Sequence, residues 1–252
     1  MLYGKLLGLI SDLAFPEGQA ILRYTKQSSE PEPAFRRYVS TIFHMYTWYS
    51  SELKPGTQLW KSLVKVRNYH SITSKMCARR GIGQITQYQM TVAQFGFMGY
   101  ILSKPKIVGI HKVADQDLEG FVHFWRVIGH LLGIEERFNI CRDSLDETKE
   151  ICDEFIKEIF RPIVLKWDPG FLNMTEALTE GLWCMMPVLN KNVCLQYVYE
   201  MVRNEDVDEP VYSEVVKLNN FEKLIYYFIK FMMYSLKFDA IRIKVSYTFV
   251  TT

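Results

Sequence analysis

Three polar side chains share one face of an otherwise apolar stretch near the N-terminal end of the chain. In "RRYVSTIFH", Arg37, Thr41 and His44 stand at positions i, i+4 and i+7, so a helix would place them side by side. A buried polar group without a partner costs about 1–3 kcal/mol, so these side chains need a cofactor carboxylate, bound oxygen or ordered water. A partly solvated face with Arg37 paired to a surface carboxylate explains the same spacing, and the spacing alone favours it.

A second candidate for chemistry is the histidine of "SLVKVRNYHSI", residues 62 to 72. Val64, Val66 and Ile72 are apolar side chains that belong inside a protein. Arg67 and His70, three residues apart, would lie on one face of the same helix. His70 is therefore either a core histidine satisfied by a neighbour or a ligand to something bound.

The remaining histidines carry weaker signals. His123, Arg126 and His130 share a face opposite Trp125, and a solvent-facing surface is the favoured interpretation of that pattern. His111 stands in a predicted loop and is assigned no role.

Motifs of the common catalytic and metal sites are absent from the sequence. It contains no HExxH, no Glu three residues before a histidine, no GxSxG, and neither CxxC nor CxxCH. The 5 cysteines are odd in number and widely spaced, which is typical of reduced, mostly buried thiols. Isolated histidines in a helical chain remain, a pattern typical of haem proteins with one axial nitrogen ligand.

The composition excludes some partners and suggests others. Hydrophobic residues make up 48% of the 252 residues and the net charge is +2, so we expect a globular protein that does not bind nucleic acid. Aromatic residues make up 14%, which suits a large apolar cavity or a membrane-facing patch.

Two apolar segments bear on membranes, and neither is expected to span one. "MLYGKLLGLISDLAF" is interrupted by Lys5 and Asp12 and is shorter than the ~20 apolar residues that a bilayer requires. Residues 221–252 hold an aromatic stretch broken by Lys230, which fits an interfacial helix or a buried C-terminal helix equally well.

Hydrophobic periodicity predicts an all-α protein, residues 1–252 forming a single domain of about eight helices. Only residues 243–250, "IKVSYTFV", have the pattern of a strand, and they lack an obvious mate. The clearest expected helices cover 33–51, 58–79, 85–103, a segment from Asp115 or Asp117 as cap to Leu132 with Gly133 as stop, Asp143 to Pro162, and "NMTEALTEGLWCMM" before Pro187.

Four motifs in order resemble one family. "SSEPEPAFRRYVSTIFHMYTW", "SLVKVRNYH", "QYQMTVAQFGFMGY" and "GFVHFWRVIGHLLGIEERFNIC" are similar to the catalytic domain of the rubber oxygenases (latex-clearing proteins) and of the fungal ER-bound oxygenase of mycophenolic acid synthesis. The resemblance covers roughly residues 20–200, and the form of the motifs is most similar to arthropod members. It implies a globin-like helical core, non-covalent haem b, and cleavage of carbon–carbon double bonds with dioxygen.

The resemblance also assigns roles to individual residues. Arg37 and Thr41 match the family's distal pair, expected to act in catalysis by hydrogen-bonding oxygen, and His70 matches the haem-ligating proximal histidine. Arg67 is then well placed for a haem propionate, and His44 could cap the distal side of the iron.

Two departures limit what the resemblance implies. Ser40 stands where the latex-clearing enzymes have a distal lysine, and none of Glu17, Glu30 and Glu32 aligns with their distal glutamate base. Rubber cleavage itself is therefore not implied. The shared element is a haem pocket for an apolar, isoprenoid or lipid substrate, in a chain expected to begin inside the family's N-terminal region, downstream of a membrane segment.

Three functions follow as hypotheses. The first is a haem b-dependent oxygenase that uses dioxygen on an apolar alkene, isoprenoid or lipid. The alternative is a non-catalytic haem-binding or lipid-binding protein of the same fold. The third is a scaffold on a membrane surface, docked by the C-terminal aromatic helix. We expect an intracellular location, with peripheral membrane contact and association with the endoplasmic reticulum left open.

Overall fold

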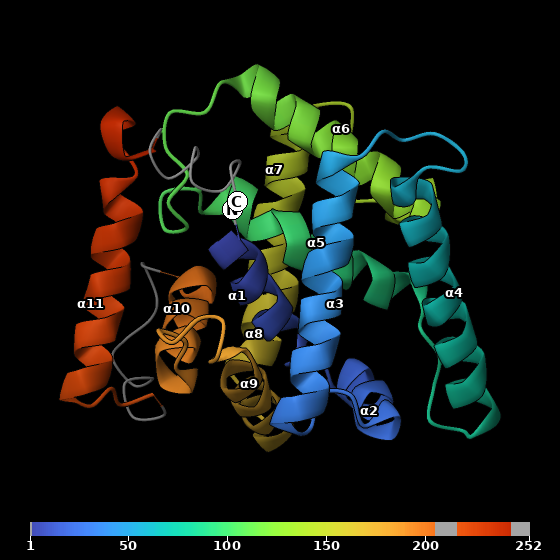
Figure 1. Ribbon diagram of the computed structural model, residues 1–252, viewed down its shortest axis with the longest axis horizontal. Coiled ribbons are helices and arrows are strands. Elements are labelled where there is room, and N and C mark those ends of the chain that lie inside the picture. Colours follow the sequence, from blue (N-terminus) through green and yellow to red (C-terminus); the bar gives the residue numbers. More distant parts are fainter. Residues whose placement is uncertain (1, 205–215, 243–252) are drawn as a thin grey trace.

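The computed structural model describes residues 2–204 and 216–242, and within these residues every regular element is a helix (Figure 1). This confirms the all-α class, with more and shorter helices than the eight expected. The α-helices are α1 Leu2–Asp12, α2 Pro16–Thr25, α3 Pro31–Ser50, α4 Gln58–Arg79, α5 Gln87–Ser103, α6 Asp115–Leu132, α7 Leu145–Glu154, α8 Arg161–Val164, α9 Pro169–Leu182, α10 Lys191–Val202 and α11 Asn220–Ser235. A 3₁₀ turn at Glu136–Phe138 precedes α7, and a π-helical turn at Phe155–Phe160 joins α7 to α8.

Helix α1 lies in the middle of the bundle, packed most extensively against α5 (Figure 1). Leu7 and Ile10 have no exposed surface, and most of the helix is buried around its circumference. The two helices cross at Gly8 and Gly96, where a Cβ on Gly8 would lie 1.9 Å from the Gly96 carbonyl oxygen. The apolar N-terminal segment is thus a core helix, and none of the described helices is long and apolar enough to cross a membrane.

Three polar side chains of α1 are drawn into this interior. Ser11 donates to the Leu7 carbonyl and accepts from the Tyr100 hydroxyl at 2.8 Å. Lys5 is only 5% exposed; its Nζ lies 2.7 Å from the Tyr49 hydroxyl, and burial lowers its pKa to about 7. The third, Asp12 at the end of the helix, belongs to the candidate site described below.

Helices α3 and α4 form an antiparallel pair at the edge of the bundle, with α4 outermost (Figure 1). The inner side of α3 packs on α9, where a Cβ on Gly181 would lie 2.5 Å from the Pro31 carbonyl oxygen. One side of α3 is thereby held by the core, while the side toward α4 is free to line a site.

Most expected helix bounds are close to the observed ones, but the helix expected to run up to Pro187 already ends at Leu182, and two expected starts are wrong. Neither Asp115 nor Asp117 caps α6: the N-cap is Ala114, and both acids lie in the first turn, where they favour the helix dipole. The next helix begins at Leu145 and not at Asp143, because the Ser144 side chain accepts a hydrogen bond from the Glu147 amide. The expected stop at Gly133 is confirmed by its left-handed φ of 106°, and the expected strand at 243–250 lies outside the described residues.

The cysteines follow the sequence expectation. All five are free thiols, Cys184 is exposed, and the other four are buried. Burial raises the pKa of Cys141 to about 12, so this thiol stays protonated.

We expect Gly8→Ala to destabilise the protein by about 2 kcal/mol or more, because the added methyl group meets backbone atoms that a rotamer change cannot move. Gly18→Ala on α2 is the matched control, since a Cβ there has no neighbour within 4 Å. It should be neutral or stabilising by up to about 1 kcal/mol through helix propensity. Chemical denaturation measures both, and equal stability of the two variants would contradict the close crossing.

Candidate functional site between α3 and α4

A buried serine sets the register of α3 against α4. The Ser62 Oγ lies 2.8 Å from Trp48 Nε1 and 2.7 Å from His44 Nδ1. Because the indole N–H can only donate, Ser62 accepts from Trp48, and its hydroxyl also forms a hydrogen bond with His44 Nδ1. Burial, and next the charge of Lys65, lower the pKa of His44 and favour its neutral form.

Two helical turns further along, the same register brings Arg37 opposite His70. His70 lies on the inward stripe of α4 with Leu63, Val66 and Cys77, so its ring faces the bundle. Burial, and next the positive charge of Arg37, lower the pKa of His70. The imidazole is therefore neutral at physiological pH, which is the form that ligates metals.

His70 also has an unused nitrogen. Its Nδ1 is buried and has no hydrogen-bond partner among the described residues. A buried polar atom in this state is costly unless something else binds it. The hydroxyl of Tyr38, on the neighbouring helix, is likewise buried and unpartnered.

Arg37 is held in place by its own contacts. One guanidinium nitrogen donates a short hydrogen bond to the Oγ of Ser28, which is fully buried. Thr41 donates its hydroxyl proton to the Arg37 carbonyl oxygen at 3.0 Å, so its side chain has only lone pairs left to offer a ligand.

Asp12 adds a carboxylate to the surroundings of Arg37. Burial raises the pKa of Asp12 to about 6, and the charge of Arg37 acts in the opposite direction. No ion pair to Asp12 occurs among the described residues, so the two groups sense each other's charge without direct contact. A carboxyl group that titrates near pH 6 can both take up and release a proton at physiological pH.

Beside these residues a groove of about 610 Å³ runs between α3 and α4. Phe35, Val39 and Phe43 give it an apolar wall, and none of its lining residues is acidic. Its other lining residues are polar or basic: Arg36, Ser40, His44, Thr47, Gln58, Lys61, Ser62 and Lys65. Arg37 and His70 do not line the groove; they lie further along the same two helices, α3 and α4.

Arg67 lies on the border of the His70 face of α4. It is exposed, and its guanidinium donates to the Leu131 carbonyl at 3.1 Å, at the C-terminal end of α6. This contact gives Arg67 a structural role, because a cation at that end of a helix is favoured by the helix dipole.

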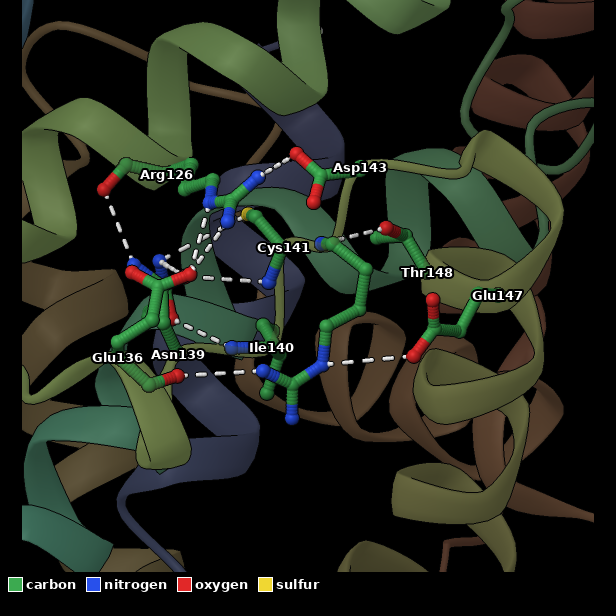
Figure 2. Close-up of polar contacts among 10 residues, drawn as sticks. Arg126, Glu136, Asn139, Ile140, Cys141, Asp143, Glu147 and Thr148 are labelled. Atoms are coloured by element: carbon green, nitrogen blue, oxygen red, sulfur yellow. Dashed lines mark hydrogen bonds and ion pairs between the residues drawn. The ribbon is translucent and has the colours of Figure 1, made fainter.

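The His123, Arg126 and His130 face is surface, as expected: both histidines are exposed. Figure 2 shows the Arg126 guanidinium between the carboxylates of Glu136 and Asp143, with a distance of 2.6 Å to Glu136. These contacts fix the segment that follows α6.

Three residues of this site were not predicted from the sequence. Asp12 looked like a mere interruption of an apolar segment, although a lone acid in such a segment is a signal for a buried carboxylate. Ser28 and Tyr38 carry no signal that distinguishes them from ordinary loop and helix residues. The three acids that were considered for the family's glutamate base, Glu17, Glu30 and Glu32, are all exposed.

The described residues form an all-helical protein in which a neutral, inward-facing histidine senses the charge of an arginine on the neighbouring helix. The model of the family described as ER-bound oxygenase mpaB/B'/rubber oxygenase, catalytic domain, matches residues 1–190. The chain belongs to this family, which places it among the oxygenases. No curated protein and no solved structure shows significant similarity to the chain.

We expect Asp12→Asn to stabilise the protein at pH 7 by roughly 1–3 kcal/mol. The folded pKa of about 6 lies above the ordinary value of 3.8, so the unfolded state ionises first as the pH rises. The cost of the buried charge therefore grows from pH 4 to pH 6 and stays constant above it.

The measurement is the free energy of unfolding from pH 4 to pH 8. The gap between Asp12→Asn and the parent should close at low pH. Asp153→Asn removes an exposed acid of α7 and is the matched surface control, which should change the free energy of unfolding by less than about 0.5 kcal/mol. A constant gap for Asp12→Asn would contradict the raised pKa.

Proposed function

We propose that the protein is a haem b-dependent oxygenase that acts with dioxygen on an apolar alkene, isoprenoid or lipid. Membership of an oxygenase family supports the reaction class. The observation that carries the cofactor assignment is the neutral His70, whose buried Nδ1 has no partner among the described residues and which faces Arg37 across two helices.

The residues at hand fit a haem. The imidazole of His70 would hold the iron, and the apolar stripe around it suits a porphyrin face. Lys61 and Lys65 on the adjacent groove offer cations for the carboxylates. Among the described residues, no three His, Cys, Asp or Glu side chains gather as a site for a bare metal ion. When bound, haem would supply the redox chemistry that activates dioxygen, which amino-acid side chains lack.

The chain's own residues would then orient and stabilise the reactants. Arg37, anchored by Ser28, presents a fixed positive charge where negative charge develops on oxygen. Asp12 holds or releases a proton in the same region, and it takes the place of the glutamate that the sequence lacks at the expected position. Ser40 leaves room at the position of the family's distal lysine, in the groove that His44 also lines.

The groove supports the substrate class. Its wall of Phe35, Val39 and Phe43 would bind an apolar chain, and its volume of about 610 Å³ falls in the range of small-molecule sites. We infer an intracellular protein at the endoplasmic reticulum membrane, an inference that rests on the family description alone.

Hemin titration tests the cofactor. The purified protein should develop a Soret band, and His70→Gly should lose it because the proposed nitrogen ligand is gone. Added imidazole should restore the band in His70→Gly by replacing the missing ring. His123→Gln, on the exposed face of α6, is the control and should bind hemin like the parent.

The outcomes separate the alternatives. A colourless protein, or a band of equal strength in folded His70→Gly, would rule out the proposed ligand. Haem binding without oxygen uptake when apolar alkenes are added would favour the non-catalytic carrier. Circular dichroism of each variant establishes that the helices remain folded.

A further inference from the structure

The outer face of α11 gathers large apolar side chains in contact with solvent. Along its 16 residues, aromatic and aliphatic side chains that are 42–67% exposed follow one another at helical spacing. The residues of this face are Phe221, Leu224, Tyr227, Phe228, Phe231, Met232 and Tyr234. A contiguous patch of this kind on a protein surface marks a site of interaction.

The opposite face of α11 packs on the bundle, so the exposed apolar face does not belong to the hydrophobic core. Tyr226 packs on Tyr197 with ring centroids 5.1 Å apart, and Glu222 accepts a hydrogen bond from Asn192 at 2.8 Å. Near the C-terminal end, His111 bonds to the Met233 carbonyl at 3.0 Å. The helix therefore presents its apolar face outward as a rigid element.

The basic and acidic residues of α11 lie on different sides of the helix. Lys223 and Lys230, seven residues apart, lie along the border of the apolar face, and Lys237 follows in the turn after the helix; these three residues are called the lysine row. Lys230 forms an ion pair with Glu200 of α10 at 3.1 Å, so Lys223 and Lys237 are the members of the row that remain for a partner. The single acid of the helix, Glu222, is buried on the inner side and caps the N-terminus. The apolar face itself carries no acid.

We propose that α11 docks on the surface of a membrane that contains anionic lipids, lying parallel to it. Phe, Tyr and Met side chains enter the interface between headgroups and acyl chains, and the lysine row contacts lipid phosphates. The helix is about 24 Å long and does not meet the requirement for crossing a bilayer. A surface of this kind goes beyond the oxygenase reaction and requires neither haem nor substrate.

Charge favours lipid over a second copy of the chain as the occupant. In a two-fold dimer built on this face, the lysine row of one copy would have no acid on the facing α11. A membrane with anionic headgroups supplies the complementary charge to Lys223 and Lys237, the two lysines of the row that are not paired with Glu200.

Sedimentation of the 252-residue chain with sucrose-loaded vesicles tests the proposal. The vesicles contain phosphatidylcholine alone or phosphatidylcholine with about one third phosphatidylserine. Phe231→Glu should lower the partition coefficient on the order of tenfold or more by placing a charge in the apolar face. Ile72→Glu on α4, equally exposed at 62% against 66%, is the control and should leave binding unchanged. Lys223→Gln combined with Lys237→Gln should remove roughly tenfold of the preference for anionic vesicles.

Light scattering of the same samples identifies the competing occupant. A dimer that Phe231→Glu converts to a monomer, without vesicle binding by the parent, would overturn the proposal in favour of a second copy. Vesicle binding that Phe231→Glu and Ile72→Glu leave equal would overturn it as well. Because no hemin is added, a failed hemin titration and a failed vesicle experiment remain distinguishable.

Discussion

The tightest packing constraint in the fold is the crossing of α1 and α5 at Gly8 and Gly96. With a Cβ on Gly8 placed 1.9 Å from the Gly96 carbonyl, no side chain fits between the two backbones. This approach holds α1 in the middle of the bundle, where a helix with both Lys5 and Asp12 would otherwise not reside. The positions of Lys5 near Tyr49 and of Asp12 near Arg37 follow from it, so a contact between two glycines decides which charges the interior receives.

The buried Lys5 and the half-buried Asp12 both work against stability. Burial lowers the pKa of Lys5 to about 7 and raises that of Asp12 to about 6, so each ionised form costs free energy relative to water. A protein selected for stability alone would replace them with apolar residues. Perturbed titratable groups of this kind cluster at functional sites, and Asp12, unlike Lys5, senses the charge of an arginine in the candidate pocket.

The parts of the fold that could be predicted from the sequence are those set by local chemistry. Gly133 ends α6 because it adopts a left-handed φ, and α4 has the expected bounds because its cap and its terminating glycines are local signals. Asp12 could not be placed, because its neighbours come from a crossing between segments that one sequence does not pair. The sequence left His70 as either a core histidine or a ligand, and only the family resemblance assigned His70 and Arg37 to one site, as its proximal and distal residues. Arg37 and His70 come near each other in the structure because the contact of Ser62 with His44 and Trp48 fixes the register of α3 against α4.

The proposed haem site and the proposed lipid surface lie far apart. Figure 1 shows α4 and α11 at opposite ends of the longest axis of the molecule. If α11 lies on a bilayer, the α3–α4 groove is held away from it, so the membrane contact concentrates the protein at the lipid surface without immersing its site. An apolar substrate then has to cross water or travel on a carrier to reach the groove. The exposed apolar side chains of α4 next to it, Val64, Tyr69 and Ile72, offer such a substrate a first contact. The two ends of the molecule would thus divide the tasks of docking and substrate capture.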